Sequence, residues 1–169
     1  MYRRPIATVA SEVNTMVRKA RAFSLVELVI VVVILGIIAA IAIPRMSRGA
    51  QGAVESRLKS DLAVLRSAIN LYAAEHNGTF PTAGTIAAQL TGYTDIDGTT
   101  NATKTGAFIY GPYIEAIPTL SVGTTKGRSA IGTADGPTIA WIYDAAAGTI
   151  TANIPVGELD SAGTPYAAY

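Results

Sequence analysis

One carboxylate lies inside the most apolar stretch of the chain, and its position limits the chemistry that the stretch can support. From Phe23 to Ile43, only Ser24, Glu27 and Gly36 interrupt a run of apolar residues. A charge at the centre of a membrane helix costs about 2.5–3.5 kcal/mol, so carboxylates within membranes usually pair with a cation. Near a helix end, the side chain can instead reach the lipid headgroups. The position of Glu27 therefore indicates either charge pairing or an acid that extends to the interface.

The remaining residues offer little for catalysis. The chain has one histidine, His76, and no cysteine, so it cannot form a cysteine–histidine pair or a histidine-based metal cluster. No nucleophile elbow, zinc-protease motif or glycine-rich phosphate loop occurs. The basic residues are not concentrated in the body of the chain, which argues against nucleic acid as a partner. The sequence predicts a protein that is not an enzyme.

A short acidic segment, "DIDGTTN" at 95–101, is the strongest candidate metal loop. Asp95, Asp97, Thr99 and Asn101 alternate like the first ligands of a calcium loop. However, the sixth position of such a loop is Thr100 rather than glycine, and the twelfth position carries no acid. We therefore predict a solvated polar loop, and neither a metal site nor a cofactor there.

The apolar run has the length of a membrane span. At 1.5 Å per residue, residues 23–43 form a helix of about 31 Å, which matches a hydrocarbon core of about 30 Å. Residues 1–22 carry five basic side chains against one acid, whereas the rest of the chain has eight against eleven. This asymmetry predicts a cytoplasmic N-terminus and a head on the opposite side of the membrane. The run is longer than the apolar part of a secretory signal, so we expect it to be retained.

After Pro44, the apolar residues fall on one side of a continuing helix. The stripe steps by three and four residues, which is the period of an amphipathic helix; its members are Val54, Leu58, Leu62, Leu65, Ile69 and Tyr72. The polar residues Arg48, Gln51, Glu55, Lys59 and Arg66 are predicted to point away from it, with Glu55 and Lys59 forming an i, i+4 ion pair.

The ends and the weak points of this helix are also readable. Asn77 or Gly78 in "HNGTFP" can adopt the left-handed conformation that ends a helix, which predicts one helix over residues 24–76. Pro44 removes one backbone hydrogen bond and Gly36 weakens the helix, so we expect bending or loosening between them.

The body from Phe80 onward is predicted to be β-rich. The segments 106–111 and 111–118 suggest a strand or turn, and 138–154 suggests a hairpin whose loop ends at Gly148. In its second strand, Ile150, Ala152 and Ile154 should share one face, opposite Thr149, Thr151 and Asn153. The polar loop 91–106 is expected to be irregular. The predicted class is α+β, with a long N-terminal helix packed on a small antiparallel sheet.

The N-terminal pattern resembles a known family. A basic leader ends in Ala22, followed by Phe23, Ser24-Leu25-Val26, Glu27, a long apolar run with Gly36, and Pro44. This order resembles the cleavage and methylation motif of type IV filament subunits, which are the type IV pilins and the pseudopilins of type II secretion. The segments "YGPYIEAIP" and "TIAWIYDAAAGTITANI" look like the head of a major pseudopilin. Two features depart from the family: Ala22 replaces the usual glycine, and the leader of 22 residues is long.

The resemblance implies a role for each of these residues. A prepilin peptidase would cut between Ala22 and Phe23 and methylate the new amine of Phe23. Glu27 would pair with that amine on a neighbouring subunit, and the helix between Gly36 and Pro44 would unwind in a stretched filament. The implied divisions are a leader (1–22), a spanning half-helix (23–44), an amphipathic half-helix (45–79) and a head (80–169). Major pseudopilins also bind calcium near the C-terminus, where Asp135, Asp144, Glu158 and Asp160 could contribute.

The implied setting is the bacterial inner membrane, crossed once with the head in the periplasm, from which subunits are extracted into a periplasmic or surface filament. The implied partners are copies of this chain, related pilin-like subunits, the prepilin peptidase and an inner-membrane assembly platform. The short head without cysteines favours a type II secretion pseudopilin that drives protein export. The alternatives are a type IV pilin of a surface pilus, used for adhesion, motility or DNA uptake, and a tethered binding module that never polymerises.

Overall fold

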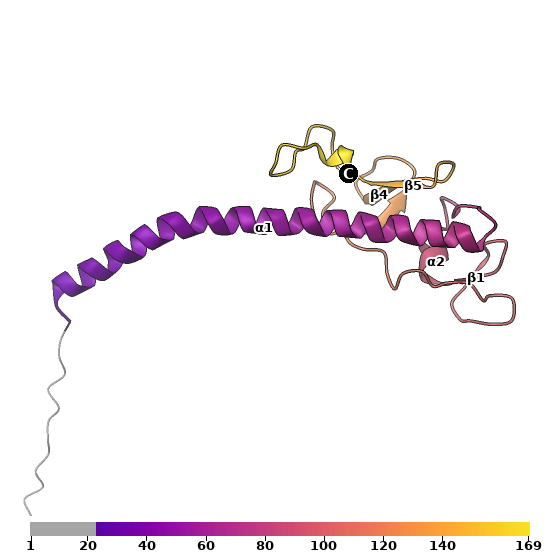
Figure 1. Cartoon of the computed structure of the whole chain (residues 1–169), viewed down its shortest axis with the longest axis horizontal. Helices are drawn as coiled ribbons and strands as arrows, with labels where there is room; N and C mark the ends of the chain where they lie inside the picture. Colours follow the sequence, from indigo (N-terminus) through magenta and orange to yellow (C-terminus); the bar gives the residue numbers. More distant parts are fainter. Residues whose placement is uncertain (1–22) are drawn as a thin grey trace, which may run out of the picture. The chain divides into compact units, whose positions relative to one another are not determined.

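A long N-terminal helix dominates the computed structural model, which describes residues 23–169 (Figure 1). Helix α1 (Leu25–Glu75) is continuous over 51 residues, so the prediction of one long helix is confirmed to within one residue at each end. The predicted leader and Ala22 lie outside the described residues. The chain divides into two compact units between Ala42 and Ile43, and we describe each by itself.

The end of α1 follows the predicted capping chemistry. Asn77 and Gly78 both have positive φ angles, of 54° and 82°. The Gly78 amide donates to the Ala73 carbonyl at 2.7 Å, which is the closing bond of a left-handed helix cap. Because glycine adopts this conformation without a Cβ clash, the sequence itself ends the helix here.

The predicted apolar stripe of α1 forms the core of the head. Val54 is half-buried, and the other five members of the stripe are buried. They pack with residues from the rest of the head, chiefly Ile86, Leu90, Leu120, Trp141, Tyr143 and Ile150. The head thus covers the apolar face of the helix.

Two small sheets and a short helix complete the head. A two-stranded antiparallel sheet pairs β1 (Tyr93–Thr94) with β2 (Thr100–Asn101). A three-stranded sheet has the order β3 (Ala130–Gly132), β4 (Ile139–Asp144), β5 (Thr149–Ala152), with β3 parallel and β5 antiparallel to β4. Helix α2 (Ile86–Thr91) precedes the sheets, and the 3-10 helix η1 (Tyr166–Ala168) follows them. The α+β class is confirmed, with one parallel pair added to the antiparallel hairpin.

One prediction about the loops is wrong, and another is resolved in favour of a turn. Residues 91–106 contain both strands of the β1–β2 hairpin, because Asp95 Oδ1 accepts the amides of Asp97 and Thr99 and so fixes the turn. For the segments 106–111 and 111–118, of the two predicted alternatives the strand is absent and a turn at 106–107 is present, closed by a bridge between Thr105 and Phe108; an isolated bridge between Tyr110 and Thr94 links the first segment to the sheet.

The hairpin at 138–154 is confirmed, but Asn153 does not follow the predicted alternation of buried and exposed side chains. Ile150 is buried and Thr149 and Thr151 are exposed, as predicted. Asn153 is buried instead of exposed, because β5 ends at Ala152. Its side-chain amide donates to the carbonyls of Gly136 and Ile139, so it ties the loop before β4 to the end of β5.

Candidate assembly segment

The first half of α1 presents apolar side chains that no other part of residues 23–169 buries. Leu25–Ile43 has a mean hydropathy of 3.2, and its side chains are exposed almost throughout. By length and composition this segment can cross a membrane. A surface of this size without a cover needs either lipid or another apolar helix around it.

Glu27 lies in the first turn of α1, where the Leu28 amide already bonds to the Ser24 carbonyl at 3.1 Å. The helix dipole favours an acid at this end. Among the described side chains, the ion pair present is Arg57 with Asp61, at 3.5 Å, so Glu27 has no ion-pair partner there. The geometry therefore leaves an exposed carboxylate one helical turn beyond Phe23.

The structure also shows the surroundings of Phe23 and Gly36 and the helical backbone at Pro44. Phe23 is exposed and precedes the helix. A Cβ added at Gly36 would meet no atom within 4 Å, so close packing inside this chain does not explain the glycine. α1 remains helical through both Gly36 and Pro44. Unwinding between them stays a prediction for the assembled state.

The comparison with protein families decides what this segment is. The model of the prokaryotic N-terminal methylation motif matches residues 17–43. Residues 17–43 carry the N-terminal methylation motif, which indicates a type IV pilin-like subunit. The match includes Ala22, Phe23, Glu27 and Gly36 and stops one residue before Pro44. Comparisons with curated proteins and with solved structures find no match.

The type IV pilin-like character has direct consequences. The motif implies processing by a prepilin peptidase and filament assembly with similar subunits, and the apolar helix fits anchoring in a membrane. Such subunits are structural proteins rather than enzymes. The motif does not distinguish a pseudopilin from a pilin.

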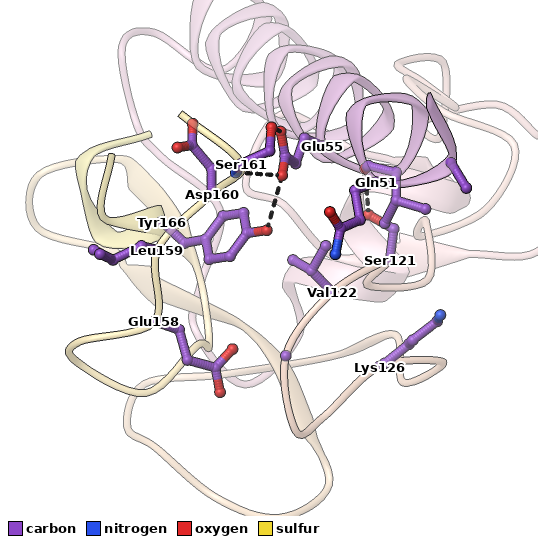
Figure 2. A pocket seen from close by; sticks show the side chains of 13 residues that line it. Gln51, Glu55, Ser121, Val122, Lys126, Glu158, Leu159, Asp160, Ser161 and Tyr166 are labelled. Carbon is purple, nitrogen blue, oxygen red and sulfur yellow. Dashed lines mark hydrogen bonds between the residues drawn. The ribbon is translucent and has the colours of Figure 1, made fainter. Parts of the chain in front are cut away.

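A second candidate site is a groove in the head of about 670 Å³ (Figure 2). Its lining combines α1, the loop after Leu120 and the C-terminal segment, and it includes Gln51, Val54, Glu55, Ser121, Lys126, Glu158 and Tyr166. Acidic and basic side chains face it from different segments. The groove belongs entirely to the unit formed by residues 43–169.

Glu55 is the main polar anchor of this groove, contrary to the sequence prediction. Its carboxylate accepts the Ser161 amide and the Ser161 hydroxyl, both at 2.7 Å, and the Tyr166 hydroxyl at 3.4 Å (Figure 2). The predicted pair with Lys59 is wrong, since the Lys59 ammonium lies over the Tyr169 ring, 4.3 Å from its centroid. Burial and the charge of Glu55 raise the pKa of Tyr166.

Asp160 organises the C-terminal turn. Its Oδ1 accepts the amides of Ala162 and Thr164, and its Oδ2 accepts the Tyr169 hydroxyl. The Tyr169 hydroxyl, followed by the Thr164 amide, lowers the pKa of Asp160. These contacts commit the carboxylate oxygens to the protein itself.

The acids considered for calcium do not gather at one place. Within residues 23–169, no group of three or more histidine, cysteine, aspartate or glutamate side chains could hold a metal ion. Asp144 instead accepts the amides of Ala146 and Ala147 in the β4–β5 turn. Asp135 and Glu158 join no such group.

His76 has a structural role. It is buried and stacks on Tyr72 with ring centroids 3.8 Å apart. Its Nδ1 lies 2.8 Å from the Tyr72 carbonyl, and its Nε2 lies 3.0 Å from Thr94 Oγ1 and 2.9 Å from the Asp95 carbonyl. The Nε2 side therefore joins the end of α1 to β1, while Nδ1 is held by the last turn of α1 itself.

Proposed function

We propose that this type IV pilin-like subunit polymerises into the periplasmic pseudopilus of a type II secretion system. The exposed apolar half of α1, with Glu27 one turn after Phe23, carries the proposal. A filament of parallel helices would bury this half against neighbouring copies, because its side chains are exposed in the part of the chain that the structure describes.

Glu27 would set the register of this packing. Cleavage between Ala22 and Phe23 would free the amine of Phe23, which stays cationic after its separate methylation. In an apolar surrounding, an unpaired charge is costly, and an opposite charge on the next subunit relieves that cost. Pairing of the Phe23 amine with the neighbour's Glu27 therefore favours one axial position over all others.

The choice of a pseudopilin over a surface pilin rests on the head. The chain has no cysteine, so its C-terminal loop cannot carry the disulfide that is common in surface pilins. Hydrogen bonds from Ser161 and Tyr166 to Glu55 hold that region without a covalent link. A head whose C-terminal region is held by hydrogen bonds rather than by a disulfide suits a filament that stays within the cell envelope.

The experiment replaces Glu27 by leucine in the native host, with Glu115→Leu on the exposed surface of the head as the matched control. The mature wild-type protein should start at an N-methylated Phe23 by intact mass. Glu27→Leu should leave membrane level and cleavage unchanged, because insertion becomes easier by up to about 3 kcal/mol and the junction is untouched. Sheared-filament yield and secretion should fall to background, whereas Glu115→Leu should keep both.

Three results would decide against parts of the proposal. Normal filaments from Glu27→Leu would return this residue to the role of an acid at the lipid interface. A mature protein that starts at Met1 would exclude filament processing altogether and favour a tethered module. Loss of surface fibres with normal secretion in a deletion strain would identify a surface pilin.

A further inference from the structure

The C-terminal residues 158–169, called here the cover segment, lie against an open edge of the sheet. β5 is an outer strand in the order β3-β4-β5, and η1 of the cover segment contacts it. In Figure 1 the yellow helix η1, next to the mark C, lies near one end of β5. Exposed strand edges promote pairing between chains, and proteins often cover them with a loop or helix.

The backbone alternation shows which groups this edge offers. The Asn153 amide donates to the Ala140 carbonyl of β4. Because the backbone groups of successive residues point to opposite sides of a strand, the N–H and C=O groups of Ile150 and Ala152 point away from β4. The Ile150 carbonyl accepts from the Arg66 guanidinium at 3.3 Å, and the same nitrogen bonds to the Tyr169 carbonyl at 2.6 Å. Arg66 thus ties the cover segment to the open edge.

Polar contacts to one face of α1 hold the cover segment. Glu55 accepts three hydrogen bonds from it, and Lys59 and Arg66 both contact Tyr169. Its apolar contribution comes from Tyr166 and Tyr169, which are half-buried against the core, whereas Leu159 is 54% exposed. Segments with few buried apolar contacts open locally at lower free energy than the core.

The sequence of β5 suits pairing with itself. Thr149–Ala152 reads Thr-Ile-Thr-Ala, without a charge or a proline that would prevent edge association. In an antiparallel pair of two β5 strands with a twofold axis at Thr151, the outward backbone groups of Ile150 meet those of Ala152 in the other copy, and the Ala152 carbonyl exchanges the bond that it accepts from the Ile154 amide at 3.0 Å. Thr151 then faces its own copy as a non-hydrogen-bonded pair, with Cα atoms about 4.5 Å apart.

We propose that the cover segment blocks this edge and that its release allows β5 to pair with β5 of a second copy of this chain. The contacts of Glu55 and Arg66 keep the edge closed. The inference concerns the head alone and does not depend on the filament role or on Glu27.

The experiment uses the absence of cysteine in the natural chain. Thr151→Cys is introduced into the full chain in detergent micelles, with and without Glu55→Gln and Arg66→Met, and disulfide dimers are quantified after mild oxidation. Opening the cover segment should raise dimer yield at least tenfold. Glu115→Gln with Lys104→Met, two exposed charges elsewhere on the head, serves as the matched control and should leave it unchanged.

Two further measurements make the result specific. Thr103→Cys reports association by other surfaces, such as the apolar helix, and should give no increase in the opened variant. In the variant with Glu55→Gln and Arg66→Met, hydrogen exchange of the backbone amides of Ser161 and Tyr166 should accelerate at least tenfold, which would show that the cover segment has opened. Accelerated exchange without Thr151→Cys dimers would overturn the proposal, as would equal dimerisation through Thr103→Cys. If the double variant loses the native emission of Trp141, Arg66→Met alone carries the same test.

Discussion

The turn between β4 and β5 allows one packing prediction to be worked out fully. Gly148 has a φ of +65°, and a Cβ built there would lie 2.5 Å from Cζ of Phe80. Two costs follow for Gly148→Ala. The left-handed conformation costs about 1–2 kcal/mol for a residue with a Cβ. Displacing a packed aromatic ring adds about 1–3 kcal/mol.

We therefore expect Gly148→Ala to lower the free energy of unfolding of the head by about 2–5 kcal/mol. Trp141, the one tryptophan of the chain, is fully buried in the head, so its fluorescence reports unfolding by urea of the full chain in detergent. Gly84→Ala is the matched control, since nothing lies within 4 Å of its added Cβ and its φ is not positive. That variant should be neutral or slightly stabilising.

A double-mutant cycle separates the two costs. Phe80→Ala removes the ring, so in that background Gly148→Ala should keep the conformational cost of about 1–2 kcal/mol and lose the steric part. A loss below about 0.5 kcal/mol for Gly148→Ala in the natural background would refute the reasoning. Equal losses with and without the Phe80 ring would assign the whole effect to the backbone.

Two further predictions concern the core and its pH dependence. Leu65→Ala should cost about 2–5 kcal/mol in urea unfolding because Leu65 is fully buried, whereas Leu71→Ala on the exposed face of the same helix should cost less than about 1 kcal/mol; equal effects would contradict the packing. Burial raises the pKa of Tyr143 to about 12 from an ordinary value of 10. The protonated hydroxyl of Tyr143 therefore contributes fully to the stability of the fold below pH 10, and this contribution is lost as the pH rises through 12. Tyr143→Phe should reduce the fall in stability between pH 10 and 12, measured by circular dichroism, and an unchanged slope would count against the shift.

Local patterns allowed the main elements to be predicted. The spacing from Leu58 to Tyr72 indicated the buried face of α1, and Asn77-Gly78 indicated its end, because helix period and left-handed caps depend on neighbouring residues. The β4–β5 hairpin was readable for the same reason. The methylation motif was also local, since the order from Ala22 to Glu27 and the apolar run lie within one short segment.

Contacts between distant segments were decided only by the tertiary structure. Helix spacing alone favours Lys59 as the partner of Glu55, because an i, i+4 residue is the one that a helix places nearby. The fold instead brings Ser161, 106 residues away, within 2.7 Å of its carboxylate, and a buried acid with three donors binds more firmly than an exposed ion pair. Arg66 and Asn153 follow the same rule: each meets backbone carbonyls that chain folding, and no spacing in the sequence, places beside it.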